Sequence, residues 1–358
     1  MSSTPELPKR ISLIAETSRT LRKNIFSGRW QDHLPGERNL CREFQISRPT
    51  LRSALKELEK DGLLRTTQGK RRRIVAEAAQ RDEPVGKGII VALSPRPLSA
   101  MAPSAIMMVD ELRTDLARAG FQLDLNVVPA CYSVRPNRAL NELKARSSAD
   151  AWIVFGSRAP MQSWLVKQGI PCLVAGSCAP RIELPSVDID YRATCRHAGG
   201  ILRSKGHRHI ALALPIGATG GEADSEAGIR EAMMQDSEGL LSVLVHDGSP
   251  EHLCRLVDKT LRQENPPTAF LVARAVHSLT VISFLMKRGH RIPQDIAVIS
   301  RDDENFLEHL TPSPNRYATN PTQFTRRISH AARKLAETGS IPPRSVRLMP
   351  DYIVGETV

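Results

Sequence analysis

The stretch from Leu34 to Val75 constrains the fold of this chain most, because it sets two short helices and a hairpin at close spacing. A first helix is predicted over residues 38–44, where Leu40, Cys41 and Phe44 share one apolar face. A break at residues 45–46 follows, and Ser47 then offers a hydroxyl to cap a second helix, whose first turn tolerates a proline. The second helix has one apolar stripe, formed by Leu51, Ala54, Leu55 and Leu58.

The other face of this second helix is basic. Arg48 and Arg52 lie four residues apart, so both side chains project from its N-terminal half. A guanidinium can pair in bidentate fashion with guanine O6 and N7, which makes such a helix suitable for the major groove of DNA. Residues 63–66 and 71–75 then predict two short strands around a turn with a glycine at its centre. The stretch therefore predicts a helix-turn-helix followed by a β-ribbon with a basic tip.

Three motifs in this stretch, LPGER, SRPTLRSAL and QGK, carry a resemblance. Residues 11–75 resemble the winged helix of GntR-type bacterial transcription regulators, with a first helix over residues 11–28. The resemblance implies DNA contacts from the LPGER arginine, from the recognition helix and from the wing tip, namely Arg38, Ser47, Arg48, Thr50, Arg52, Gln68, Gly69 and Lys70. The alternative is a solvated basic face on an ordinary helical subdomain, which a motif match of this length disfavours.

Positive charge is concentrated in this part of the chain. The 358 residues carry a net charge of +12, and residues 1–80 contain 17 Lys and Arg against 9 Asp and Glu. The rest of the chain contains 33 against 29, which says little. This concentration predicts a polyanionic partner, double-stranded DNA. A membrane is the competing partner, but the basic residues do not face a bulky apolar stripe, and no apolar run is long enough to span a bilayer.

The first residues, MSSTPELPKRIS, lack the apolar region of a secretory signal, so a cytoplasmic protein is expected. The six cysteines have no C-x-x-C pair and no histidine-rich ligand spacing, which favours buried reduced thiols over disulfides or metal ligands. His207 and His209 are interpreted as turn residues. No metal, cofactor or catalytic residue is predicted, because no Ser-His-Asp, Cys-His or paired-carboxylate arrangement has motif support.

Beyond the basic stretch, the chain changes character. Residues 1–10 are expected to be a disordered tail, and residues 76–87 lose apolar periodicity and are interpreted as a linker. From residue 88, continuous apolar runs alternate with amphipathic helical patterns in two sets, which is typical of parallel sheets covered on both faces. The predicted fold class is α/β, with a winged helix-turn-helix ahead of two lobes. Neither set contains G-x-G-x-x-G, so dinucleotide binding is not expected.

The second set carries a further resemblance, in residues 187–214, 266–274 and 288–303. These segments are similar to the effector domain of LacI-type regulators, which is itself similar to periplasmic sugar-binding proteins, and the likeness extends over about residues 88–357. It implies two Rossmann-like lobes joined by crossovers near Val187, Ala318 and Ile341. Lobe 1 then comprises about residues 88–186 and 319–340, and lobe 2 about residues 187–318 and 341–358.

Ligands of open parallel sheets bind at the carboxyl ends of strands, and this rule selects polar residues in both lobes. The effector-binding candidates are Ser94, Ser104, Ser225, Arg274 and Asp302. The strand ends also offer Arg96, Ser157, Arg158, Asp224 and His277. Compared with the LacI-type pattern, Ser225 replaces an arginine and Arg274 an asparagine, while Asp302 matches the first aspartate of an Asp-Asp pair. For any single residue, ordinary loop solvation is the alternative.

These features predict a ligand-responsive bacterial transcription regulator, expected to be a repressor, that binds operator DNA as a homodimer. A small molecule in the inter-lobe cleft, a sugar or sugar acid, is the expected effector. Arg274 beside Asp302 would suit a carboxylated ligand, unless the two side chains simply bridge and close the pocket. Two alternatives stay open: a winged helix fused to a pyridoxal-phosphate-dependent, aminotransferase-like domain, and a constitutive DNA binder whose second domain only dimerises.

Overall fold

The computed structural model describes residues 13–26, 29–30, 32–60, 62–65, 72–75, 87–216, 220–234 and 238–358. The chain divides into two compact units, Met1–Gly86 and Lys87–Val358. Three predicted features lie outside the described residues: the tail over residues 1–10, the linker up to residue 86, and the wing tip formed by Gln68, Gly69 and Lys70.

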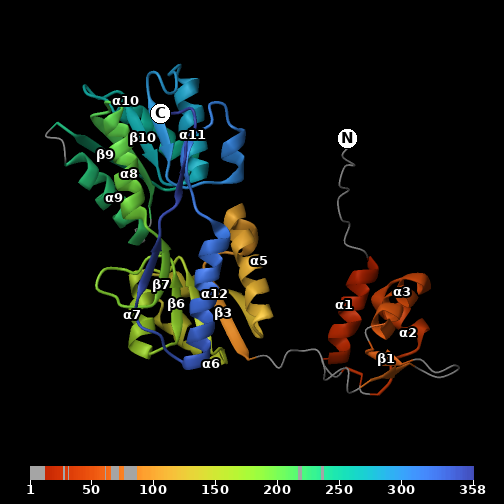
Figure 1. Ribbon diagram of the computed structural model, residues 1–358. Helices are drawn as coiled ribbons and strands as arrows, with labels where there is room; N and C mark the ends of the chain where they lie inside the picture. Colours follow the sequence, from red (N-terminus) through yellow and green to blue (C-terminus); the bar gives the residue numbers. More distant parts are fainter. Residues whose placement is uncertain are drawn as a thin grey trace. The chain divides into compact units, whose positions relative to one another are not determined.

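The N-terminal unit is a bundle of three helices completed by a β-ribbon (Figure 1). Its elements are α1 (Leu13–Phe26), α2 (Glu37–Phe44), α3 (Arg48–Lys60), β1 (Leu64–Arg65) and β2 (Arg73–Ile74). The two strands are antiparallel, with Leu64 opposite Ile74. The apolar stripe predicted for α3 is buried together with Leu21, Ile25, Leu40 and the ribbon. The predicted helix-turn-helix and ribbon are therefore confirmed.

Local chemistry sets the ends of α3. Ser47 Oγ accepts a hydrogen bond from the backbone N–H of Thr50 at 3.3 Å, so the predicted cap is present. Gln45, at the break between α2 and α3, adopts the left-handed conformation with a φ of 52°. Gly62 follows α3 with a φ of 76°, which glycine adopts without steric cost. The path of the chain into and out of α3 is therefore defined by short-range interactions.

Lobe 1 of the second unit has a parallel sheet of order β13-β7-β6-β5-β3-β4. The strands are β3 (Gly88–Ser94), β4 (Phe121–Val127), β5 (Ala151–Phe155), β6 (Cys172–Ala175), β7 (Ser186–Ile189) and β13 (Ser345–Leu348). One face packs against α5 (Pro103–Arg118) and α12 (Pro321–Thr338). The other packs against α6 (Asn137–Arg146) and α7 (Ala159–Gln168). Short 3-10 turns, η1 (Leu98–Ala100) and η2 (Pro129–Tyr132), precede α5 and α6.

Lobe 2 repeats this arrangement with the order β14-β12-β11-β10-β8-β9, parallel except for β14. The strands are β8 (His209–Pro215), β9 (Leu240–His246), β10 (Ala269–Val272), β11 (Ala297–Ser300), β12 (Asn315–Ala318) and β14 (Asp351–Ile353). Helices α8 (Tyr191–Ser204) and α9 (Gly220–Met233) cover one face. Helices α10 (Pro250–Leu261) and α11 (Ala275–Lys287) cover the other, and η3 (Asn305–His309) follows β11.

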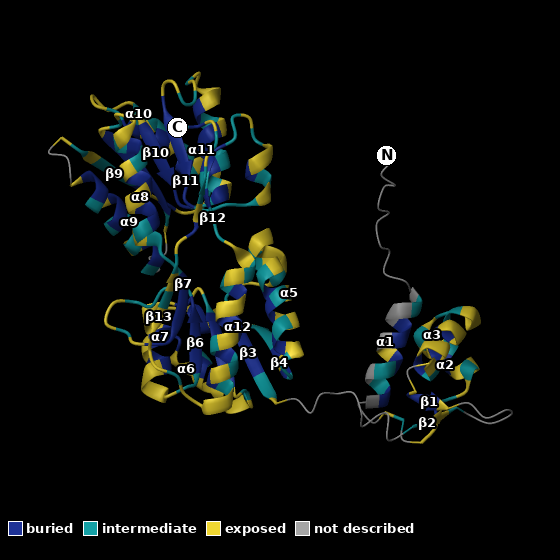
Figure 2. Cartoon of the chain, in the orientation of Figure 1, coloured by how far each residue is buried: buried dark blue, intermediate teal, exposed yellow. Residues whose placement is uncertain are grey.

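The central strands of both lobes are buried beneath helices whose outer faces are exposed (Figure 2). This burial on two sides explains why the central strands read as continuous apolar runs in the sequence. The predicted α/β architecture of the second unit is confirmed.

The lobe boundaries differ from those expected. Strand β7 pairs in parallel with both β6 and β13, so residues 186–189 and 345–348 belong to lobe 1. The crossover near Ala318 lies where it was expected, whereas the other two follow Ile189 and Leu348 instead of lying near Val187 and Ile341. The difference arises because β13 is an edge strand with no apolar run, and its pairing partner cannot be read from its own residues.

Two polar contacts join the lobes directly. Glu304, beyond β11 of lobe 2, accepts hydrogen bonds from the backbone N–H and hydroxyl of Ser104 at the start of α5 in lobe 1. Arg347 of β13 pairs with Asp224 of α9 at 3.2 Å between Nη1 and Oδ2. Both contacts join residues of lobe 1 to residues of lobe 2.

The thiols agree with the cysteine prediction in part. All six cysteines are free, and Cys131, Cys172 and Cys195 are buried, whereas Cys41, Cys178 and Cys254 are half-buried. Burial raises the pKa of Cys172 to about 12.

In the part of the chain that the structure describes, no group of His, Cys, Asp and Glu is arranged to hold a metal ion, and no helix is long and apolar enough to cross a membrane.

Candidate DNA interface and effector site

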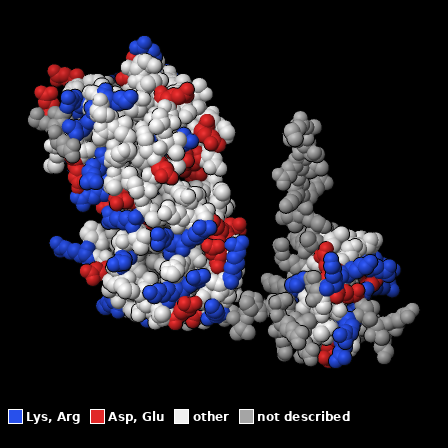
Figure 3. Space-filling model, viewed as in Figure 1, with Lys and Arg blue, Asp and Glu red and all other residues white. Residues whose placement is uncertain are grey.

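The N-terminal half of α3 presents an exposed polar surface. Arg48 and Arg52 are both exposed on its first two turns, while Ser47 and Thr50 are tied to each other at 2.7 Å between their hydroxyls. Arg38 is exposed on the first turn of α2. In the space-filling view, Lys and Arg side chains gather over α2 and α3, with acidic side chains among them (Figure 3). The described residues thus bring five of the eight predicted DNA contacts onto neighbouring elements, and the other three form the wing tip outside them.

A chain of ion pairs lies behind this surface. Glu37 at the start of α2 accepts from Arg52 Nε at 2.9 Å and, through its other oxygen, from Arg72 Nη1 at 2.9 Å. Arg72 Nε donates in turn to Glu59 of α3 at 2.8 Å. Burial alone would raise the pKa of Glu37, but hydrogen bonds and charge from Arg72 and Arg52 hold that pKa below its ordinary value. Glu37 is therefore a carboxylate at neutral pH.

In lobe 2, the ends of β10 and β11 bring the two charged effector candidates together. Arg274 Nη1 lies 3.2 Å from Asp302 Oδ2, and Arg274 Nη2 donates to Glu222 of α9 at 2.8 Å. Burial alone would lower the pKa of Arg274, but the charges of Asp302 and Glu222 raise it above its ordinary value. The bridge between Arg274 and Asp302, considered above as the alternative to a ligand contact, is thus present in this structure.

Arg301 completes the cluster, and its side chain is fully buried. Its Nε lies 3.1 Å from Asp302 Oδ1, its Nη1 donates to Ser225 Oγ at 2.6 Å, and its Cζ stands 4.0 Å from the centre of the Tyr191 ring. A cation over an aromatic face is attracted by the ring quadrupole. Its Nη2 is buried and has no hydrogen-bond partner among the described residues. Ser225 itself donates to Gly221 O, so its hydroxyl is used on both sides.

The two serine candidates of lobe 1 do not join this cluster. Ser94 is buried, donates to Arg96 O at 2.7 Å and accepts from Arg96 N. Ser104 is paired with Glu304 across the lobes, as described above. Their polar groups are engaged within the protein, and neither side chain is directed at Arg274 or Asp302 by any bond in the structure.

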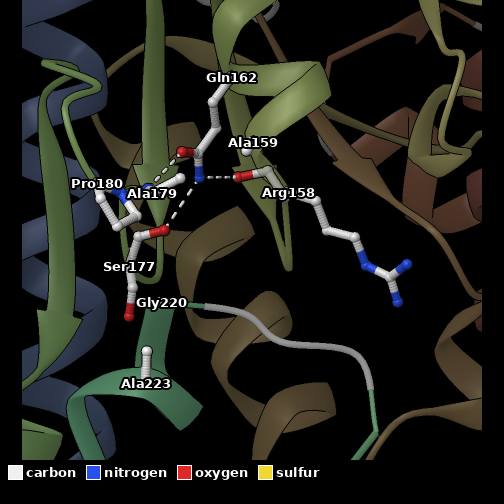
Figure 4. Close-up of a pocket in the computed structure, with 9 residues that line it drawn as sticks. Arg158, Ala159, Gln162, Ser177, Ala179, Pro180, Gly220 and Ala223 are labelled. Carbon is white, nitrogen blue, oxygen red and sulfur yellow. Dashed lines mark hydrogen bonds between the residues drawn. The ribbon is translucent and has the colours of Figure 1, made fainter. Parts of the chain in front are cut away.

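A cavity of about 210 Å³ lies between the lobes (Figure 4). Its lobe 1 wall includes Ser157 and Arg158, selected above by the strand-end rule, and its lobe 2 wall is formed by Gly220 and Ala223 at the start of α9. Arg158 extends away from the other lining residues. The cavity therefore uses the N-terminal turn of α9, the same turn that carries Glu222.

Gln162 of α7 organises the lobe 1 wall. Its amide donates to Ser157 Oγ at 2.9 Å and to Ser177 O at 3.0 Å, and accepts from Ala179 N at 2.7 Å (Figure 4). Sequence reasoning did not single out Gln162, Ser177, Glu222, Arg301 or Tyr191. Ser177 and Arg301 follow the ends of strands, so the strand-end rule contained the signal for them. Gln162 and Glu222 lie on helices and gave no such signal.

Asp188, at the end of β7, is the perturbed carboxyl of this region. Its side chain accepts a short hydrogen bond from Ser177 and is almost completely buried. Burial raises its pKa to about 6, against the opposing effects of the Ser177 hydroxyl and the charge of Arg347.

The glycines of α9 allow the lobes to approach here, because a Cβ on Gly220 would stand 2.5 Å from Ser177 Cβ and 2.9 Å from Cys178 O.

The paired histidines have structural partners. His209 bonds Asn265 O and Ser242 Oγ, each at 2.8 Å, and His207 bonds Thr268 Oγ1 at 2.9 Å. His207 precedes β8, but His209 is the first residue of that strand rather than a turn residue as predicted.

Two family models match separate parts of the chain. Residues 13–74 match the family described as bacterial regulatory proteins, gntR family. Residues 199–358 match the family described as periplasmic binding protein-like domain. Both resemblances noted in the sequence are confirmed.

Individual relatives match over shorter spans. The HTH-type transcriptional regulator CelR of Thermobifida fusca is 28% identical over 207 residues, which cover 55% of this chain and 54% of that protein. The HTH-type transcriptional regulator AglR of Rhizobium meliloti is 28% identical over 199 residues, or 52% of this chain and 56% of that protein. The chain thus spans about half the length of these relatives.

Solved structures share the fold of the second unit. A regulatory protein of the LacI family from Chloroflexus aggregans has a TM-score of 0.66 at 18% identity, covering 76% of this chain and 98% of that one. Transcription regulator CcpA of Lactococcus lactis has a TM-score of 0.65 at 16% identity, covering 75% and 98%. The second unit has a LacI-type fold, so the alternative of an aminotransferase-like second domain is wrong.

Proposed function

We propose that this chain, which joins a domain of the gntR family of bacterial regulatory proteins to a periplasmic-binding-protein-like domain, is a ligand-responsive transcription regulator. It acts in the cytoplasm as a repressor and is not an enzyme. The observation that carries the proposal is the capped helix α3, which exposes Arg48 and Arg52 on its first two turns beside the exposed Arg38 of α2. A two-lobed domain of the kind that closes on small molecules follows in the same chain.

In the proposed complex, α3 enters the major groove with its N-terminal end toward the bases. Arg48 and Arg52 read base edges, Ser47 and Thr50 contact the backbone or bases at the start of the helix, and Arg38 binds phosphate. The wing tip, Gln68, Gly69 and Lys70, adds a contact in the minor groove. Because one small DNA-binding domain contacts few base pairs, the protein binds an inverted repeat as a homodimer.

The dimer is proposed to form through α11. This helix exposes Val276 and Met286, with Leu279 partly exposed between them, so an apolar stripe faces outward along its length. Val276 is 55% exposed and Met286 is 48% exposed. A second copy of the same helix would cover this stripe, because a two-fold interface pairs identical surfaces.

The proposed effector is a sugar or sugar acid bound between the lobes. Asp302 can accept hydrogen bonds from ligand hydroxyls, and Arg274 offers a fork for a carboxylate. Ser225, Ser94 and Ser104 complete the proposed set, although each already has a partner within the protein. The cavity of about 210 Å³ lies between the same lobes but is lined by other residues, among them Ser157, Gln162 and Ser177, so its volume does not set the size of a ligand held by Asp302 and Arg274.

One observation favours a second candidate function, a constitutive DNA binder whose second domain only dimerises. The charged groups of lobe 2 are paired with one another, since Arg274 bonds Glu222 and Asp302, and Arg301 bonds Ser225 and Asp302. A ligand would have to compete with these pairs. The two candidates differ in whether any small molecule changes DNA affinity.

The DNA-binding part of the proposal is tested by selection from a random-sequence duplex library with the full chain. The expected result is an inverted-repeat consensus. Arg48→Ala and Arg52→Ala should each lose about 1–3 kcal/mol of discrimination at one base pair per half-site, because each removes one bidentate reader. Sequencing of the selected pools measures both effects. If the wild-type chain enriches no sequence above the starting library, the proposed function is wrong.

A further inference from the structure

We infer that Glu37, whose charge is wrong for a DNA contact, determines base specificity by holding Arg52 in its reading orientation. The inference rests on the proposed function and adds a positioning residue to it. Glu37 lies in the first turn of α2, on a different helix from Arg52, and is only 23% exposed at its side chain against 65% for Arg52. It therefore supports Arg52 from the protein side.

The contact between Arg52 and Glu37 determines which guanidinium nitrogens of Arg52 remain available to bind DNA. Glu37 Oε2 accepts from Arg52 Nε at 2.9 Å, and no other partner of Arg52 occurs in the described part of the chain. A guanidinium bound at Nε keeps Nη1 and Nη2 available, and these two nitrogens match guanine O6 and N7 in an end-on bidentate pair. The contact thus leaves Nη1 and Nη2 of Arg52 available to a base while it fixes the orientation of the guanidinium group.

Glu37 is itself anchored. Its second oxygen accepts from Arg72 Nη1 at 2.9 Å, and Arg72 Nε donates to Glu59 Oε1 at 2.8 Å. The ion pairs therefore run from Arg52 of α3 to Glu37 of α2, and then through Arg72, just before β2, back to α3. Burial alone would lower the pKa of Arg72, but Glu59 and Glu37 raise it above its ordinary value, so the anchor stays charged.

Arg48 gives the contrast. It is exposed on the same helix, and no ion pair to it occurs among the described residues. A free arginine side chain must lose rotamer freedom when it pairs with a base, whereas a side chain already held in place loses less. We therefore expect stricter discrimination at the base pair read by Arg52 than at the one read by Arg48.

The negative charge of Glu37 distinguishes a role in positioning Arg52 from direct binding of Glu37 to DNA. A carboxylate beside DNA repels phosphates, so its removal should maintain or increase affinity for random sequence. If Glu37 acts through Arg52, its removal should still reduce specificity. A variant that is simply misfolded would lose both specificity and affinity for random sequence, so a loss of specificity alone is not expected from general damage to the fold. The pair with Arg52 is exposed and contributes little to stability, whereas the pair with Arg72 is half-buried, so the melting temperature of the Glu37 variant is measured beside its selection profile.

The test compares the full chain with Glu37→Gln and with Glu43→Gln, using selection from the random duplex library. Glu43 is the matched control, because it lies on the same helix, has the same charge and pairs with Arg29 at 2.7 Å, away from α3. Glu37→Gln should lower discrimination roughly fivefold or more at the single base pair that Arg52→Ala also affects. Glu43→Gln should leave the profile unchanged, and neither variant should weaken binding to random duplex.

Two further variants keep the inference testable. In the Arg52→Ala background, Glu37→Gln should cause no additional loss at that base pair, and an additional loss would overturn the inference. Glu37→Asp withdraws the carboxylate by one methylene and keeps the charge, so it should reproduce the single-position loss if Glu37→Gln fails to fold. A Glu37→Gln profile identical to that of a sequence-selective wild type overturns this inference alone, whereas absence of selection by the wild type overturns the proposed function.

Discussion

Arg301 is the largest fully buried side chain of the described residues, and its partners explain how a charge is tolerated there. Asp302 supplies the opposite charge, Ser225 a hydroxyl and Tyr191 an aromatic face. A buried charge without such partners would cost several kcal/mol or more. The strand-end rule found Asp302, Ser225 and Arg274 because it depends on backbone topology alone. The rule also covers Arg301, which directly follows β11, but nothing in the sequence predicted that this side chain is buried, because arginine is ordinarily exposed.

Asp188 gives a prediction at the same scale. Its folded-state pKa of about 6 lies above that of an unfolded aspartate, so the folded state holds the proton more tightly. The resulting stabilisation is present at about pH 4 and is lost as pH rises to about 6. Asp188→Asn removes the titration, so the melting temperature of the variant relative to wild type should increase across this interval and stay constant above it.

The pKa of Asp188 rises from 3.8 to about 6 on folding. This difference corresponds to roughly 3 kcal/mol of folding free energy between low and high pH. Thermal unfolding of both proteins at several pH values between 4 and 8 measures it. A difference between Asp188→Asn and wild type that does not vary with pH would contradict this account of the carboxyl.

At the scale of elements, predictability follows burial. The continuous apolar run over residues 151–155 forms β5 with the same ends, and its first four residues are buried. Strands β13 and β14 were not predicted, because both lie at sheet edges and have half-exposed residues without an apolar run. Helix α7 has no clear amphipathic pattern, because its short segment buries the polar Gln162 and exposes the apolar Val166. Pairing partners of edge strands are tertiary information, which local pattern does not contain.

Helix α11 gives a prediction at this scale. If its outward stripe forms the dimer contact, Val276→Asp places a charge in an apolar interface and should shift the protein from dimer to monomer. Val166→Asp on α7 is the matched control, because Val166 is 49% exposed and belongs to another surface. Sedimentation velocity at several concentrations measures the distribution. A wild-type monomer, or a Val276→Asp dimer of unchanged affinity, would contradict the proposed interface.

At the scale of the whole molecule, two units with different physical characters occupy one chain. The N-terminal unit concentrates positive charge and exposes arginines on one helix, whereas the second unit buries a charged cluster at the ends of its strands. A ligand shifts a two-state protein only by its difference in affinity for the two states. Regulation therefore requires that closure of the lobes changes the DNA affinity of the whole dimer. Sequence patterns predicted both units but carry no direct signal of this coupling.

The most direct test of the central claim measures operator affinity with and without ligand. A panel of sugars and their acids is first screened for compounds that raise the melting temperature of the full chain, because a ligand bound only by the folded state stabilises it. Fluorescence anisotropy then measures the Kd for the selected consensus duplex. A saturating compound should change the Kd by about tenfold or more, which is about 1.4 kcal/mol of coupling. Asp302→Ala should retain DNA affinity and lose this response. A Kd that stays constant while the compound is bound would contradict ligand gating and support the constitutive alternative.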